Sequence, residues 1–302
     1  MTNRWPELPL EAWRDTKETL HRWTQVVGKI RMTLTPLVNH WWNVTLYVTS
    51  RGLATSPIPC GTRTFEVVFD FLQHRLLIQS SDGAAESLAL APISVMEFYG
   101  ELMHRLQQLD IAVHIWTMPS EIGNAVPFDQ DRTHAHYDPI YAQRFWRVLL
   151  QSDRVMKAFR ARFLGKVSPV HFFWGSFDLA VTRFSGRRAP PPTGNTPNVG
   201  SWVMREAYSH EVSSCGFWPG NGGYGRAAYY VYAYPQPADY EKTKLRTPGA
   251  FYDGGLGQFI LPYDVVRQLS DPDALLLGFF QETYEAAADQ AGWDRAALER
   301  SS

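Results

Sequence analysis

Two stretches of the chain resemble each other and decide the expected fold: HWWNVTLYVT at residues 40–49 and HFFWGSFDLAVT at residues 171–182. The tetrapeptide LYVT at 46–49 matches LAVT at 179–182, and SPIP at 56–59 matches APPP at 189–192 at the same offset. Side chains alternate between the two faces of a sheet along a strand. The two extra residues in the second stretch therefore leave its later side chains on the same face as their counterparts in the first. We therefore expect an internal duplication with two repeats, 1–130 and 131–302, packed as one compact unit.

The order of elements around these stretches points the same way. In the first repeat we expect a helix near 10–31, strands near 40–49, 64–72, 74–80 and 86–91, a helix near 93–109 and a strand near 111–118. In the second we expect a helix from Asp138-Pro139 to about 163, strands near 170–184, 205–217, 227–234 and 257–261, and a helix opened by Asp271-Pro272. Short connections imply antiparallel pairing. The predicted class is α+β, with about four strands in each half flanked by helices; chance similarity between two hydrophobic strands is the alternative to duplication.

Composition indicates a globular protein that binds neither nucleic acid nor membrane. The 302 residues have a net charge of −1, and no apolar run approaches the roughly 20 residues of a membrane span. The N-terminus lacks the pattern of a signal peptide, and the two cysteines, Cys60 and Cys215, lack the spacing of a zinc site or a disulfide framework. We expect a cytoplasmic location. The 11 tryptophans predict large aromatic contacts in the core or around a ligand.

One face of the two similar strands has the composition of a binding site. Alternation along the expected strands places certain side chains on the same face as asparagine, serine and threonine residues. They are Trp41 on the first strand, and Trp174 and Asp178 on the second. Aromatic rings mixed with a few polar groups are typical of small-molecule sites. A solvent-exposed sheet face alternates in the same way, so both interpretations remain open.

Three histidines are the candidate catalytic or metal-binding residues. His40 and His171 begin the similar strands, and His210 lies on a strand expected to be near His171. If the three imidazoles converge, they could bind a Zn or Fe ion or act as general acid and base. Structural histidines that hydrogen-bond to separate carbonyls are the alternative.

Two further motifs are interpreted as structural. The HAHYD sequence at 134–138 resembles a metal motif, but Asp138 precedes Pro139 as a helix cap. Gly220, Gly222 and Gly225 have the spacing of a dinucleotide-binding loop, yet a strand rather than a helix follows, which favours a glycine hairpin or a lid.

A basic cluster suggests an anionic ligand. Arg183 and Arg187 lead from a strand into the loop at 185–200, which is rich in Pro, Gly and Asn, and Arg205 follows that loop. Guanidinium groups pair well with carboxylates and phosphates. We expect these three residues to contribute to substrate binding.

Several long motifs resemble a known family. They are NHWW at 39–42, SPVHFFWG at 168–175, DLAVTRFSGR at 178–187 and EAYSHE at 206–211. They are similar to an uncharacterised bacterial family catalogued as a domain of unknown function. The resemblance covers nearly the whole chain and implies a bacterial protein, but it implies no reaction, cofactor or catalytic residue.

The sequence leaves three classes of function open. The favoured hypothesis is an enzyme of unknown reaction that acts on a small, anionic and partly aromatic molecule in a cleft between the two repeats. A non-catalytic small-molecule binding protein is the second, and a structural or interaction module whose aromatic residues only pack is the third. No nucleophile motif decides whether the protein is an enzyme.

Overall fold

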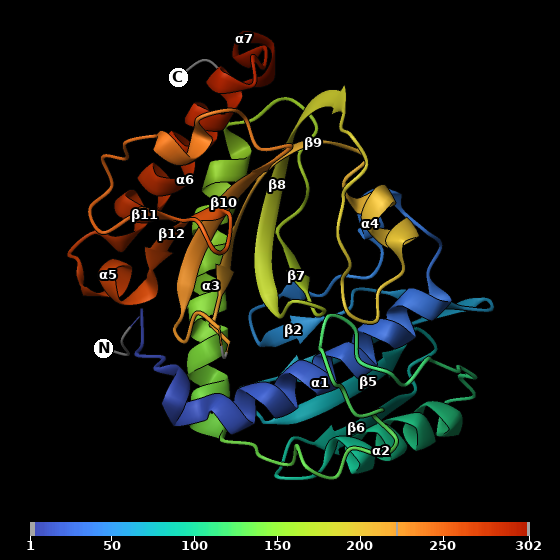
Figure 1. Cartoon of the computed structure of the whole chain (residues 1–302). Helices are drawn as coiled ribbons and strands as arrows, with labels where there is room; N and C mark the ends of the chain where they lie inside the picture. Colours follow the sequence, from blue (N-terminus) through green and yellow to red (C-terminus); the bar gives the residue numbers. More distant parts are fainter. Residues whose placement is uncertain (1–3, 222, 301–302) are drawn as a thin grey trace.

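The computed structural model describes residues 4–221 and 223–300. They form an α+β fold with two antiparallel sheets of six strands each, and helices pack on both (Figure 1). The predicted class is therefore confirmed. Each sheet has six strands rather than about four.

The first sheet lies between two helices in sequence. The elements are α1 (Leu10–Leu34), η1 (Asn39–Trp41), β1 (Tyr47–Val48), β2 (Gly52–Ala54), β3 (Ile58–Cys60), β4 (Arg63–Asp70), β5 (Arg75–Ser80), β6 (Ala85–Ala89) and α2 (Val95–Gln108). The strand order is β1-β2-β4-β5-β6, and β3 pairs with β4. Ser94 and Glu97 form a capping box that starts α2.

The second sheet follows the long helix α3 (Pro139–Ala161). Its strands and the intervening helix are β7 (His171–Phe173), β8 (Asp178–Arg188), α4 (Ser201–Ala207), β9 (His210–Trp218), β10 (Ala228–Tyr234), β11 (Phe251–Asp253) and β12 (Gln258–Pro262). The strand order is β11-β12-β10-β9-β8-β7. The remaining elements are η2 (Tyr240–Lys242), α5 (Tyr263–Gln268), α6 (Pro272–Gln290) and α7 (Arg295–Leu298). As expected, Asp138 and Asp271 cap α3 and α6.

Four expected strands differ from the observed elements. The stretch 170–184 is not one strand but an antiparallel hairpin of β7 and β8, with a turn at 174–177 between them. The stretch 40–49 is a 3-10 turn followed by a short strand, because His40 and Trp41 both adopt left-handed backbone angles, with φ of 59° and 61°. Hydrogen bonds to α4 replace a strand ladder there. The stretch 111–118 forms no regular element, and 205–217 divides into the end of α4 and β9.

The two sheets are joined at their first strands. Leu46 and Phe172 exchange backbone hydrogen bonds of 2.9 and 2.8 Å, which links the edge at β1 to the edge at β7. One hydrophobic core contains residues of both halves, including Trp23, Phe98 and Phe145. Figure 1 shows α1 beside the first sheet, with α3 crossing toward the second. Within the described ranges, no helix is long and apolar enough to cross a membrane.

Candidate functional site

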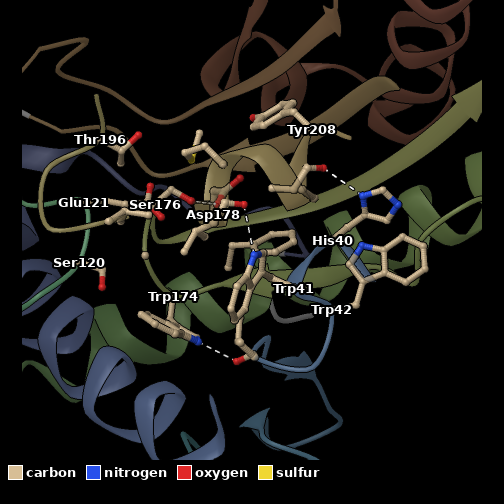
Figure 2. Close-up of a pocket in the computed structure, with 18 of the residues that line it drawn as sticks. His40, Trp41, Trp42, Ser120, Glu121, Trp174, Ser176, Asp178, Thr196 and Tyr208 are labelled. Carbon is tan, nitrogen blue, oxygen red and sulfur yellow. Dashed lines mark hydrogen bonds between the residues drawn. The ribbon is translucent and has the colours of Figure 1, made fainter. Parts of the chain in front are cut away.

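A cavity of about 370 Å³ lies against one face of the second sheet. Its floor comes from β8, β9 and β10, through Asp178, Ala180, Thr182, Val212, Ser214, Tyr230 and Tyr232. The opposite walls come from α1, η1, α4 and the segment 116–121, as Figure 2 shows in part. Both halves of the chain therefore contribute to it.

Five tryptophans contribute to the apolar wall. They are Trp41, Trp42, Trp116, Trp174 and Trp202. Two of them are fixed by their indole nitrogens: Trp41 Nε1 donates to the Val203 carbonyl at 3.2 Å, and Trp174 Nε1 donates to the Val44 carbonyl at 2.7 Å (Figure 2). Trp116 and Trp202 remain 59% and 58% exposed, which is unusual for rings of this size and leaves them free to contact a ligand.

Two carboxyl groups lie on the polar side of the cavity. Asp178, buried at the start of β8, accepts hydrogen bonds from the Ser176 and Tyr230 hydroxyls, and burial raises its pKa. Burial, followed by the charge of Asp178, raises the pKa of Glu121 to about 7. Glu121 is nevertheless an exposed residue by surface area. The cavity reconciles the two observations, because the Glu121 carboxyl meets water inside a hollow with mainly apolar walls (Figure 2).

Two glycines make room for these polar groups. Glu121 Oε1 occupies the space that a Cβ on Gly175 would need. The Tyr230 ring lies in the same way over Gly216, its partner on β9. The position of each side chain therefore depends on a glycine distant in sequence.

Tyrosine hydroxyls complete the polar side. The Tyr208 and Tyr232 hydroxyls are 3.0 Å apart, and Tyr230 donates to Asp178. The mutual effect of Tyr208 and Tyr232 together with burial raises the pKa of Tyr208, and burial is the main cause of the raised pKa of Tyr230 and Tyr232. All three phenols therefore stay protonated and can donate hydrogen bonds at neutral pH.

Lys29 of α1 reaches the cavity from the aromatic side. Its Nζ lies 4.8 Å from the ring centre of Trp116 and 6.0 Å from that of Trp174. Burial lowers the pKa of Lys29 to about 8. The Lys29 ammonium group lines this cavity together with the carboxyl groups of Glu121 and Asp178.

Some residues of the cavity wall have a strained backbone. Glu121 has a φ of 62°, and His40 and Trp41, elsewhere on the wall, also have positive φ. Left-handed conformations are costly for residues with side chains and occur often at functional sites. The strain supports a role in binding or catalysis for this wall.

The three histidines do not converge as predicted. His40 and His210 have ring centres 5.7 Å apart, but His171 pairs with Ala180 near the start of β8, whereas His210 pairs with Arg188 at its end. His171 packs against Trp42 and Tyr47 instead. In residues 4–221 and 223–300, no three His, Cys, Asp or Glu side chains are placed to hold a metal ion.

The surroundings of His171 and His40 indicate structural roles. Burial lowers the pKa of His171 to about 3, and neither ring nitrogen has a hydrogen-bond partner among the described residues. His40 lines the cavity, but its Nδ1 lies 3.1 Å from the Ala207 carbonyl and its Nε2 lies 2.6 Å from Lys166 Nζ. With Lys166 donating to Nε2, the neutral His40 ring donates from Nδ1 and ties η1 to α4.

The three arginines predicted to bind substrate do not line the cavity. Arg183 is buried, with its guanidinium 3.5 Å from the ring centre of Phe159. Arg187 pairs with Glu211 at 2.7 Å, and the exposed Arg205 donates to the Ser201 hydroxyl. Strand alternation explains Arg183, which follows Thr182 on β8 and so faces the other side of the sheet.

The predicted Trp41, Trp174 and Asp178 do line the cavity, but sequence reasoning missed Glu121 and Lys29. Lys29 shares its helix face with Arg22, Gln25, Val26, Met32 and Thr33, so no apolar pattern around it marks it as a site residue. Nothing local to Glu121 marks it, since a strained loop brings it to Asp178.

Comparison with known proteins gives a family but no relative of known activity. No curated protein matches the sequence, and no solved structure matches the fold. Residues 5–300 match the family described as "Family of unknown function (DUF5996)". This match spans nearly the whole chain, and the protein therefore belongs to the DUF5996 family.

Proposed function

We propose that the protein is an enzyme that acts on a small, partly aromatic molecule in this cavity, with Glu121 as the group that transfers a proton. One observation supports this above the others: a carboxyl group with a pKa of about 7 faces a cavity walled by tryptophans, beside a second buried carboxyl. A general acid or base works best when its pKa lies near the working pH. Perturbed pKa values of this kind cluster at functional sites.

The neighbouring groups have complementary roles in this proposal. Asp178 is held by two hydroxyl donors, so it fixes the local charge and keeps the pKa of Glu121 high. The Tyr208 and Tyr232 phenols can donate to an oxygen on which negative charge develops. The tryptophans hold the planar, apolar part of the molecule.

The cavity draws on both halves of the chain, which supports the proposal that the ligand binds in a cleft between two repeats. Lys29, Trp41 and Glu121 come from the first half, and Asp178 and Tyr230 come from the second. We keep the internal duplication and a bacterial, cytoplasmic setting as part of the proposal.

A non-catalytic binding protein is the second candidate. The observation that favours it is the aromatic enclosure itself, since five tryptophans and the small helix α4 can surround a ligand without reacting with it. Such a protein would bind a ligand without consuming it.

A comparison of depletion with binding separates the two candidates. The purified protein is incubated with a small-molecule extract from bacterial cells, and mass spectrometry follows which compounds bind and which disappear. We expect at least one compound to be consumed by the wild type and to be bound but not consumed by Glu121→Gln. Glu86→Gln, on β6 outside the cavity, is the matched control and should behave as the wild type. A compound bound in the cavity and consumed by neither protein would favour the binding protein.

A further inference from the structure

Among the residues that the structure describes, Lys29 is a buried ammonium group with no hydrogen-bond or ion-pair partner. The residue is 1% exposed, and its Nζ faces the cavity between Trp116 and Trp174. Across the two described ranges, no carboxylate or hydrogen-bond acceptor pairs with Nζ. Two aromatic rings offset part of the cost of burying this charge, but they do not replace a hydrogen-bonded anion.

The other buried basic side chains of α1 show what Lys29 lacks. Lys17 pairs with Glu18 at 2.9 Å. Arg22 pairs with Glu18 at 2.8 Å and with Asp131 at 3.3 Å. Arg31 donates to the Thr45 carbonyl. Each of these three charges has an acceptor within the protein, whereas the acceptor for Lys29 must come from whatever enters the cavity.

We propose that Lys29 binds the carboxylate of the cavity's ligand, so that the ligand is an aromatic carboxylic acid. This inference rests on the proposed small-molecule site and names the class of molecule that it takes. A single ammonium group matches a monoanion, and a dianionic phosphate would need further cations that the cavity lining does not supply. The tryptophans beside Lys29 provide flat surfaces for the ligand's ring.

The arrangement also orients the ligand. Its carboxylate lies at Lys29 of α1, with Trp116 and Trp174 beside it. The rest of the molecule extends along the cavity to Glu121 and the tyrosine hydroxyls, which line the same cavity and where proton transfer is proposed. Lys29 therefore acts in binding and orientation, and Glu121 in the chemical step.

Paired acids and amides test the proposal without any knowledge of the natural ligand. Phenylacetate is compared with phenylacetamide, and indole-3-acetate with indole-3-acetamide, by isothermal titration calorimetry near neutral pH. Each pair has nearly the same shape and differs in charge. We expect at least one acid to bind about tenfold or more tightly than its amide, as the loss of one charge-assisted hydrogen bond implies. If neither acid binds better than its amide, the proposal is wrong, and this result needs no variant that must fold.

Variants then assign the preference to Lys29. Lys29→Met keeps the apolar stem and should abolish the preference for the acid, while the exposed Lys157→Met should keep it. A preference that survives in a folded Lys29→Met protein would also overturn the proposal. Glu121→Gln should retain the preference, because binding does not need proton transfer. If Glu121→Gln stops consumption but Lys29→Met keeps the preference for the acid, the proposed enzyme stands and the carboxylate site is wrong. If Lys29→Met loses the preference but Glu121→Gln still consumes the compound, the carboxylate site stands and the catalytic role of Glu121 is wrong.

Discussion

Glu121 links the chemistry of the cavity to the stability of the fold. Its pKa is about 7 in the folded chain against an ordinary 4.5, so the folded state holds a proton that the unfolded state releases between these values. The contribution of Glu121 to stability therefore falls as pH rises from 4.5 to 7, and above 7 its carboxylate is a constant cost. Glu121→Gln should remove that cost and gain about 1–2 kcal/mol over the wild type at high pH, a value reduced because water reaches the carboxyl.

Urea unfolding of the wild type and Glu121→Gln at about pH 5 and about pH 8 measures this effect. The difference between the two proteins should grow with pH. Glu86→Gln on β6 is the control and should show no such growth. A constant difference between Glu121→Gln and the wild type would mean that Glu121 titrates as an ordinary surface carboxyl.

Tyr230 is expected to matter because it serves a buried acceptor. Its hydroxyl donates to Asp178, which is only 7% exposed. Tyr230→Phe leaves that carboxyl with one donor fewer and should lower the free energy of unfolding by about 1–3 kcal/mol. Tyr99→Phe is the matched control, since the Tyr99 hydroxyl makes no hydrogen bond in the described part of the chain. Equal stability of the two variants in urea would show that the Tyr230 hydrogen bond contributes nothing net.

Sequence marked Trp174 and Asp178 as site residues, but strand parity explains only part of this. Asp178 begins β8, whereas Trp174 lies in the turn between β7 and β8, where strand alternation does not apply. Strand alternation also places Arg183 on the face of β8 away from the cavity, although its charge alone had suggested a role in substrate binding. Glu121 depends on a left-handed backbone angle and on space left by Gly175, and neither has a local pattern that sequence reasoning can read.

At the level of elements, the pairing of β9 with β10 depends on a missing side chain. A Cβ at Gly216 would overlap the Tyr230 ring and the Leu179 carbonyl on the neighbouring strand. Gly216→Ala should therefore destabilise the fold by about 1–3 kcal/mol, the usual cost of overpacking. Gly100→Ala is the control: open space surrounds that position on α2, and the change should stabilise the helix by about 0.5–1 kcal/mol. Thermal unfolding of both variants checks the opposite signs, and a neutral Gly216→Ala would show that the ring moves aside freely.

The helix α4 is held mainly by the turn η1. None of its residues is buried, and three hydrogen bonds attach it: Trp41 Nε1 to the Val203 carbonyl, His40 Nδ1 to the Ala207 carbonyl, and the His40 amide to Glu206. Trp41→Phe removes the first bond and should speed hydrogen–deuterium exchange of the 201–207 amides several-fold, with no change in α3. Trp116→Phe is the control, because Trp116 lines the cavity but contacts Lys29 of α1, and it should leave α4 exchange unchanged. Unchanged exchange in Trp41→Phe would mean that the other contacts hold α4 by themselves.

The expected strand at 40–49 does not form as predicted, and the reason again lies in contacts between elements. Its alternating apolar pattern suits a strand, but His40 and Trp41 exchange strand pairing for hydrogen bonds to α4. Those partners lie more than 150 residues away in the chain, so periodicity alone could not reveal them. The long helices α3 and α6 were predicted well because their caps, Asp138 and Asp271, are local signals, whereas the short helix α4 was not predicted.

For the whole molecule, sequence predicted the class and the order of helix, antiparallel strands and helix, because short connections force antiparallel pairing. How the two sheets join was not predictable in the same way. The Leu46–Phe172 bridge and the packing of α1 against α2, β3 and α3 are contacts between distant segments. The internal duplication remains a prediction from sequence. The stretch 40–49 is a 3-10 turn followed by a short strand, whereas 171–182 is a hairpin of β7 and β8.

The join at Leu46 and Phe172 predicts that the halves fold together. A single core spans both, and separation would expose Phe145 and Phe172 together with the unpaired edge of β7. We expect the intact chain to unfold in one transition, with circular dichroism and tryptophan fluorescence giving the same midpoint. The fragments 1–130 and 131–302, expressed alone, should be unfolded or aggregated, and their co-expression should restore a folded complex. Two separate transitions, or a fragment 131–302 that folds alone, would show instead that the halves are independent domains and that the cavity between them forms only by docking.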